Sequence, residues 1–191
     1  MDPTPDKQEF FEAMYRESED PWNFATDAYE ANRYDTIMRL IGERTFRRVF
    51  EPGCSIGILT QRLAHIATRI EAMDISPTAV ERAGVRVACH QNVAVTLGSL
   101  PANIPDGCFD LIVLSEVGYY MDELTLRGLM DQLVRRLERH GELLAAHWLG
   151  VSPDHELSGD RVHEIIGNVS GLVLENSARY EGFRIDKWIR Q

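Results

Sequence analysis

The sequence predicts an α/β fold in which a mostly parallel, seven-stranded sheet carries helices on both faces. Between residues 47 and 149, short apolar runs alternate with helical segments, as is typical of strands that helices cover on both sides. After residue 170 the pattern changes to two alternating runs joined by Glu181 and Gly182, which predicts a β-hairpin. The last strand is therefore expected to lie antiparallel at one edge of the sheet.

Two helices are expected before the first strand. Residues 6–17 have helical composition, and residues 26–45 begin with a capping residue at Thr26 or Asp27 and end near Gly42. The rest of the alternating pattern predicts strands at 47–52, 69–75, 93–100, 109–117 and 141–149, with helices at 57–67, 76–87, 122–140 and 159–169.

Length and composition favour one soluble domain spanning residues 1–191. No apolar run approaches the roughly 18 residues of a membrane span, and the acidic start is unlike a signal peptide, so a cytoplasmic protein without a membrane span is expected. The net charge of −10 disfavours nucleic acid as a partner. Three cysteines without CxxC spacing predict neither a disulfide framework nor a metal site.

The stretch VFEPGCSIG, residues 49–57, carries the first functional signal. Gly53, Ser55 and Gly57 follow a strand and open a helix, so the backbone there can approach a ligand closely. Glu51 at the strand end would repel a dinucleotide pyrophosphate, and it suits a ligand with a positively charged amino-acid end. The alternative is an ordinary tight turn between strand and helix.

These residues resemble the first motif of the class I methyltransferases, which is an acid, one residue, then GxGxG. Glu51, Gly53, Ser55 and Gly57 match it, with serine in place of the middle glycine. The resemblance implies a Rossmann-like fold and the cofactor S-adenosyl-L-methionine. It also implies that Asp74 binds the ribose and that Ile75 packs on the adenine, although Asp74 could instead cap the following helix.

Two further segments match motifs of the same family. Ser99 stands where an acid usually contacts the adenine amino group, and the backbone amide of Leu100 could also reach the ring. In FDLIVLSEVGYYM, the resemblance places Ser115 and Glu116 on the side of the cofactor's methyl group. The terminal hairpin also distinguishes these methyltransferases from NAD-binding relatives.

Segments outside the shared core resemble the nodulation protein S family: DPWNFATDAYEANRYDTIMRLI, SEVGYYM, AHWLG and SGDRVHEII. That resemblance implies N-methylation of the free amine on the terminal glucosamine of a deacetylated chitooligosaccharide, in the biosynthesis of the lipochitooligosaccharide Nod factor. Aromatic platforms and polar groups suit a sugar acceptor. The candidates are Trp22, Tyr119, Tyr120, Trp148, Asp160 and His163. Each aromatic residue could instead belong to the core, and His163 could face solvent.

Transfer of the methyl group requires a neutral amine, because a protonated amine has no lone pair to donate. Glu116 is predicted to orient the amine and His147 to accept the proton, with a purely structural histidine as the alternative. Arg33 is predicted to pair with the cofactor carboxylate or else to be a solvated helix charge. Residues 1–45 are predicted to form a helical lid on a core at 46–191, and the lid is expected to become ordered when the cofactor binds.

Two rival functions remain open, and a third is disfavoured. A small-molecule N- or O-methyltransferase of another pathway would share the fold and cofactor. A nicotinamide oxidoreductase is disfavoured by Glu51 and the hairpin. A binding module without catalysis is suggested by the serines at positions 55 and 99. Acceptor length, oligomeric state and binding order lie beyond the sequence.

Overall fold

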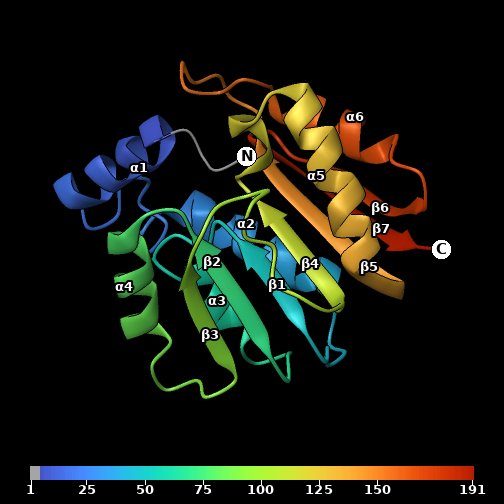
Figure 1. Ribbon diagram of the computed structural model, residues 1–191, viewed down its shortest axis with the longest axis horizontal. Coiled ribbons are helices and arrows are strands. Elements are labelled where there is room, and N and C mark those ends of the chain that lie inside the picture. The colour runs from blue at the N-terminus through green and yellow to red at the C-terminus, as the bar shows by residue number, and fades with distance from the viewer. Residues whose placement is uncertain (1–4) are drawn as a thin grey trace. The chain divides into compact units, whose positions relative to one another are not determined.

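The computed structural model describes residues 5–191 (Figure 1). Both helices expected before the first strand are present, and the later elements alternate as predicted. In chain order the elements are α1 (Pro5–Glu17), α2 (Ala28–Ile41), β1 (Val49–Pro52), α3 (Ile58–Leu63), β2 (Ile70–Asp74), α4 (Pro77–Arg86), β3 (Val93–Leu97), β4 (Phe109–Ser115), the 3-10 turn η1 (Gly118–Tyr120), α5 (Glu123–Arg136), β5 (Leu137–Trp148), α6 (Gly159–Gly167), β6 (Leu172–Arg179) and β7 (Phe183–Arg190).

The strands form a mixed seven-stranded sheet in the order β3-β2-β1-β4-β5-β7-β6. The predicted hairpin is confirmed, but its place in the sheet differs from the expectation. Strand β7 lies between β5 and β6 and is antiparallel to both, so β6 is the edge strand. The physical reason is composition: Phe183, Ile185 and Trp188 of β7 are fully buried, whereas most of β6 is exposed.

The helix expected at 122–140 also ends early. It stops at Arg136, and Leu137 already belongs to β5, where it pairs with Phe109 of β4. Both side chains are buried. The burial of Leu137 in the sheet beside Phe109 therefore outweighs the helical propensity of residues 137–140.

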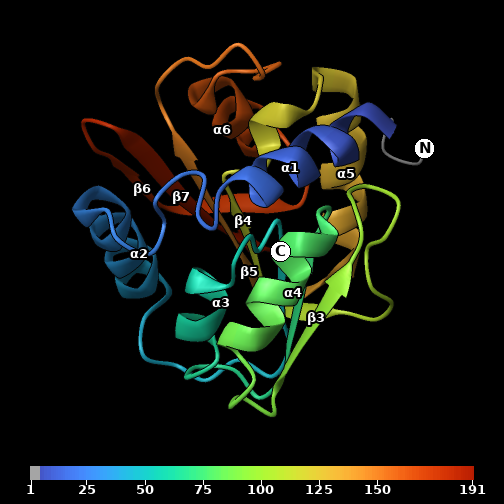
Figure 2. The same ribbon diagram turned by 90° about the vertical axis from the view of Figure 1, so that its left-hand side faces the viewer.

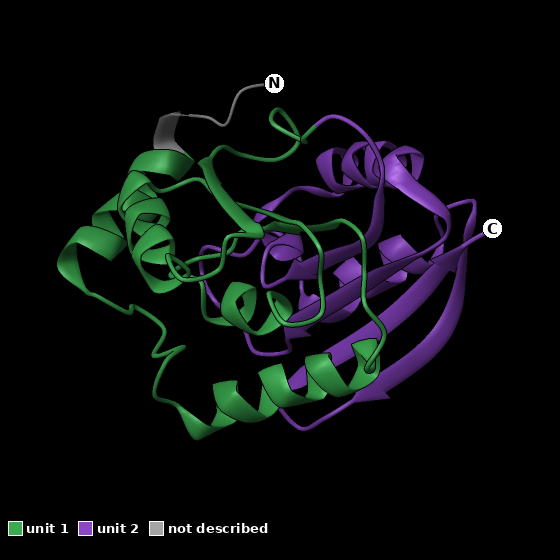
Figure 3. Cartoon of the chain, turned by 90° about the horizontal axis from the view of Figure 1, so that it is seen from below, with its two compact units in different colours: residues 1–105 green, residues 106–191 purple. Residues whose placement is uncertain are grey.

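The chain divides into two compact units, residues 1–105 and 106–191, coloured green and purple in Figure 3. In the first unit, β1, β2 and β3 are parallel, and α3 and α4 pack on each other and on β2. Helix α1 lies beside α4 in both Figure 1 and Figure 2. Asp27 caps α2 by accepting from the amide of Tyr29, and Gly42 ends the helix at φ +84°, as predicted.

In the second unit, β4 and β5 are parallel, and α5 and α6 pack together and on β5. The core here is made of the apolar residues of β4, β5 and β7 with those of α5 and α6. None of the helices within residues 5–191 has the length and apolar character needed to cross a membrane.

Candidate functional site

The turn after β1 has a backbone conformation that suits glycine and other small residues, as the sequence predicts. Gly53, Ser55 and Gly57 all have positive φ, at +73°, +51° and +81°. A Cβ atom on Gly57 would lie 3.1 Å from the Cα of Ala83, so α4 packs against this glycine. Ser55 takes up the left-handed conformation in which glycine is easiest to place, which accounts for a glycine at this point in the family motif.

Asp74 is built into the same turn. Its carboxylate accepts hydrogen bonds from the amide of Ser55 (2.8 Å) and from that of Ser76 (3.0 Å). Ser76, rather than Asp74, caps α4 by accepting from the amide of Ala79. Burial raises the pKa of Asp74 to about 6, although the amides of Ser76, Ser55 and Ile75 act against this.

Glu51 has the largest pKa shift among the described acids of the first unit. It is 2% exposed, and burial raises its pKa to about 8, helped by the charge of Asp74 and only partly offset by the Thr60 hydroxyl nearby. Its Oε2 atom is buried and has no hydrogen-bond partner among the described residues. Such an atom favours a cationic donor, because a buried carboxylate is stabilised most by a charge-assisted hydrogen bond.

Helix α1 is held against this turn by polar contacts that the sequence did not predict. The hydroxyl of Tyr15 donates to Ser55 Oγ (2.6 Å). The carboxylate of Glu12 accepts from the hydroxyl of Ser76 (2.6 Å) and from the amide (3.0 Å) and hydroxyl (2.7 Å) of Thr78. Burial raises the pKa of Glu12, but these hydrogen bonds prevail and hold it at about 2. Glu12 is therefore an ionised anchor between α1 and α4.

Trp22 belongs to the same first unit. It is partly buried against Tyr15 and Ile56, and its ring centroid lies 5.5 Å from those of Tyr15 and Phe24. The structure thus places the predicted sugar platform Trp22 beside the glycine turn, next to α1.

The predicted adenine contacts lie after β2 and β3. Ser99 is 7% exposed, and its Oγ atom has no hydrogen-bond partner within residues 5–191. Its amide donates to the side chain of Asn103 (3.0 Å). Ile75 and Leu100 are half-buried, so each leaves part of an apolar side chain accessible at its strand end.

Arg33 is not a solvated helix charge. It is 1% exposed, forms an ion pair with Glu30 on the same helix, and lies 5.0 Å from the ring centroid of Tyr34. Its pairing with a cofactor carboxylate remains a prediction.

In the second unit, Glu116 stands directly after β4 with φ +58°, next to half-buried Ser115. One carboxylate oxygen accepts from the amide of Trp148 (2.9 Å), and the other accepts from the hydroxyl of Tyr119. Both oxygens are therefore held in place, as an orienting residue requires.

His147 does not have the geometry of a proton acceptor for a substrate. It is fully buried, and its Nε2 accepts from the amide of Gly118 (3.0 Å). That bond requires the proton on Nδ1, which lies 3.2 Å from Nε2 of His163. His163 in turn has its Nδ1 2.9 Å from Asp186. Since both nitrogens of His147 are engaged, it has no lone pair left for the amine, and the alternative of a structural histidine describes it better.

His163 and Asp160 are likewise not free for a substrate. His163 is 1% exposed, and burial lowers its pKa despite the neighbouring carboxylate of Asp186. It therefore neither faces solvent nor offers a surface for a sugar. Asp160 pairs with Arg179 and Arg184, and the hydrogen bond from Arg179 lowers its pKa.

The structure brings three predicted aromatic residues, Tyr119, Tyr120 and Trp148, into contact with His155, which the sequence did not indicate. The ring of His155 stacks on Tyr119 with centroids 3.8 Å apart, and it meets Tyr120 (5.2 Å) and Trp148 (6.1 Å) edge-on. We call these four residues the aromatic cluster. His155 lies in an irregular segment, between strand and helix, where no periodicity marks a residue as buried or exposed.

Comparison with known proteins shows the family of this chain. The family model for nodulation protein S matches residues 6–155. The chain belongs to the nodulation protein S family. Its relatives in that family include nodulation protein S from Sinorhizobium fredii strain NGR234, 28% identical over 138 residues, and from Azorhizobium caulinodans, 30% identical over 130 residues. These matches cover 70% and 67% of this chain but 64% and 62% of the relatives, less than two thirds of their length.

Solved structures show the same fold. N-methyltransferase NodS from Bradyrhizobium japonicum WM9, in complex with S-adenosyl-L-homocysteine, superimposes with a TM-score of 0.82 at 22% identity, over 93% of this chain and 96% of that one. A protein from Pseudomonas syringae assigned to the methyltransferases is 33% identical, with a TM-score of 0.76 over 86% of this chain and all of that one. This member of the nodulation protein S family therefore has the class I methyltransferase fold.

Proposed function

We propose that this protein is an S-adenosyl-L-methionine-dependent N-methyltransferase that methylates the free amine on the terminal glucosamine of a deacetylated chitooligosaccharide. The observation that carries the proposal is the unpartnered, buried carboxylate oxygen of Glu51 beside a turn with three positive φ angles. Membership of the nodulation protein S family supports the choice of acceptor.

The residues of the first unit fit the cofactor. Glu51 would accept from its ammonium group, and that charge would compensate for the burial that raises the pKa of Glu51 to about 8. Asp74 would accept from the ribose hydroxyls, for which its two oxygens retain lone pairs beside the amides of Ser55 and Ser76. The unpartnered hydroxyl of Ser99 would meet the adenine amino group, and Ile75 the ring face.

The second unit would bind the sugar. Tyr120, Trp148 and His155 are partly accessible and present rings of the kind that pack on pyranose faces. Glu116 would orient the amine, because its carboxylate is fixed by Trp148 and Tyr119 on either side. Net charge −10 favours a cationic acceptor such as an amino sugar.

When bound, S-adenosylmethionine supplies an electrophilic methyl group, so the protein need only hold the amine in line and free of its extra proton. Proximity and alignment of two bound reactants can remove roughly 7–11 kcal/mol of a barrier. The protein therefore requires a binding site for each reactant and a proton acceptor, and no covalent catalyst.

Calorimetry tests both halves of the proposal. S-adenosylhomocysteine is titrated into the protein first, and a deacetylated chitooligosaccharide is then titrated into the complex. We expect both to bind, and we expect a fully acetylated oligosaccharide of the same length to bind the complex more weakly. Absence of S-adenosylhomocysteine binding would refute the cofactor assignment.

Two alternatives predict different outcomes. A methyltransferase of another pathway would transfer labelled methyl groups to other small amines or hydroxyl compounds in an acceptor panel, and not to the oligosaccharide. A binding module without catalysis would bind S-adenosylhomocysteine and transfer no methyl group. It is motivated by Ser55 and Ser99, which replace residues more usual in the fold.

A further inference from the structure

The aromatic cluster holds an imidazole that is free to take up a proton. Within the part of the chain that the structure describes, neither ring nitrogen of His155 makes a hydrogen bond, although its main-chain amide bonds to Ser152. The side chain is only partly buried, so a ligand can reach it. In contrast, both nitrogens of the fully buried His147 are engaged.

We propose that His155 is the catalytic residue that accepts the amine proton in the methyl transfer. This assignment rests on the proposed function, and it replaces His147 in that role. Glu116 is a weaker candidate for the base, because both of its carboxylate oxygens already accept hydrogen bonds.

The ring of His155 is held in a defined orientation, as a proton acceptor requires. It stacks on Tyr119 at 18° between the ring planes, and the hydroxyl of the same tyrosine donates to Glu116. One side chain thus positions both the proposed base and the residue that orients the amine. Edge contacts from Tyr120 and Trp148 limit rotation of the ring from two further directions.

The charges around His155 suit both of its protonation states. Burial lowers its pKa from 6.5, so the free ring is neutral at pH 7 and keeps a lone pair. The charges of Asp154 and Glu116 act in the opposite direction and stabilise the imidazolium once it has formed. The rings of Tyr119 and Tyr120 also contact His155, and burial raises the pKa of Tyr120 well above 10, so this phenol stays neutral.

The step balances in atoms and charge. The ammonium of the glucosamine gives its proton to a ring nitrogen of His155, leaving a neutral amine. The nitrogen lone pair then forms the N–C bond to the methyl group as the C–S bond breaks and its electron pair remains on sulfur. The imidazolium afterwards returns the proton to water.

The test compares His155→Gln with His155→Phe, which keeps a ring to stack on Tyr119, and with the matched control His65→Gln at an exposed histidine of the first unit. We expect both variants at position 155 to lose at least roughly 100-fold in kcat at pH 7, within the usual contribution of general base catalysis. Affinity for S-adenosylhomocysteine should stay within twofold of the wild type. Below the pKa of the amine, the rate of His155→Gln should fall tenfold per pH unit, and added imidazole should restore part of it.

A second readout needs no turnover. In the complex with S-adenosylhomocysteine, the NMR signal of one ring nitrogen of His155 should shift when the deacetylated oligosaccharide is added, because that nitrogen then accepts a hydrogen bond from the amine, and it should not shift with the acetylated one. Unchanged signals, or wild-type kcat in both variants at every pH, would overturn the assignment while leaving the proposed function intact. A wild-type protein that binds S-adenosylhomocysteine but methylates no amino sugar would overturn the proposed acceptor and this assignment with it.

Discussion

Replacing Glu51 by glutamine should stabilise the unliganded protein at neutral pH and above, and it should weaken the binding of S-adenosylhomocysteine. Burial raises the pKa of Glu51 from 4.5 to about 8, so the folded protein binds one more proton than the unfolded chain between these values. Stability therefore falls as the pH rises through this range. Glutamine has nearly the same shape and no charge, so it removes this dependence.

The magnitude follows from the size of the pKa shift. A pH of 7 is 2.5 units above the pKa of 4.5 that Glu51 has in the unfolded chain, so its carboxyl is ionised there. In the folded protein the pKa is about 8, so the carboxyl is still mostly protonated. At about 1.4 kcal/mol per unit, Glu51→Gln should gain about 3 kcal/mol in free energy of unfolding at pH 7. The gain should be below about 1 kcal/mol at pH 5 and reach about 4 kcal/mol at pH 8.

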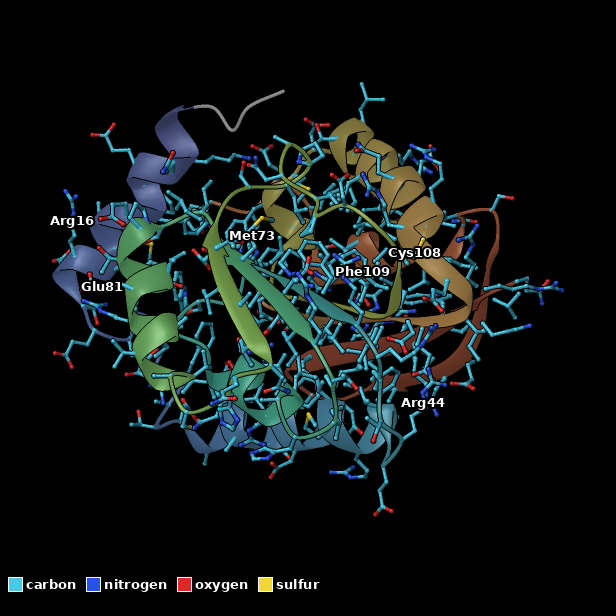
Figure 4. The ribbon with its side chains drawn as sticks, turned by 60° about the horizontal axis from the view of Figure 1, so that its bottom comes forward. Arg16, Arg44, Met73, Glu81, Cys108 and Phe109 are labelled. Carbon is cyan, nitrogen blue, oxygen red and sulfur yellow. The ribbon has the colours of Figure 1, made fainter. Side chains whose placement is uncertain are left out.

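Urea unfolding of wild type and Glu51→Gln at pH 5, 7 and 8 measures this difference. Glu81→Gln, which removes an exposed carboxylate of α4 on the outer side of the first unit, is the matched control (Figure 4). A stability difference that is the same at all three pH values would refute the reasoning, since the predicted gain comes from the proton alone.

Cofactor binding should respond in the opposite sense. A charge-assisted hydrogen bond contributes about 1.5–3 kcal/mol, so Glu51→Gln should weaken S-adenosylhomocysteine roughly 10- to 150-fold. Wild-type affinity should rise with pH up to about 8, because the ammonium group requires the ionised form of Glu51 and binding releases its proton. An affinity independent of pH between 6 and 8 would show that Glu51 does not bind this group.

Three further outcomes follow from other contacts. Glu12→Gln should loosen the packing of α1 on α4 and speed proteolysis near residues 18–24, and an unchanged cleavage rate would contradict the role of Glu12 in holding α1. Because hydrogen bonds hold the pKa of Glu12 at about 2, its stabilising effect should persist down to pH 4.5 and disappear between pH 4.5 and pH 2. Gly57→Ala should cost about 1–3 kcal/mol in urea unfolding, since φ is +81° and Ala83 is in contact, and a cost under about 0.5 kcal/mol would contradict this. Nitrogen NMR at pH 7 should show His147 protonated on Nδ1 and not on Nε2. Because burial lowers the pKa of His163, which is bonded to His147, the free energy of unfolding should decrease as the pH falls below 6.5.

Local patterns in the sequence were sufficient for most of the elements and for the geometry of the turn after β1. The caps at Asp27 and Ser76, the glycine-rich turn after β1 and the alternation in the hairpin each depend on residues close together in the chain. The acids Glu51 and Asp74 were also predictable, because each ends a strand of a parallel sheet and such ends line the usual ligand site.

The surroundings of the residues proposed to bind the acceptor were predictable only in part. The sequence indicated Glu116, Tyr119 and Trp148, but it assigned the proton to His147 and did not consider His155. Residue type alone does not separate these two histidines. The difference is that Gly118 and His163, both distant in sequence, occupy the nitrogens of His147, while His155 stacks on Tyr119 with its nitrogens free of such bonds within residues 5–191.

The sequence by itself determined where most of the helices and strands lie, that a carboxylate stands at the end of each of the first two strands, and that a turn rich in glycine and serine follows the first of them. Only the tertiary structure decided that β7 enters the sheet ahead of β6, that α1 is anchored to α4 through Glu12, and which imidazole keeps a lone pair. The physical reason is that secondary structure and turns follow from neighbouring residues, whereas the burial and hydrogen bonding of a polar side chain depend on groups that folding brings to it from elsewhere in the chain.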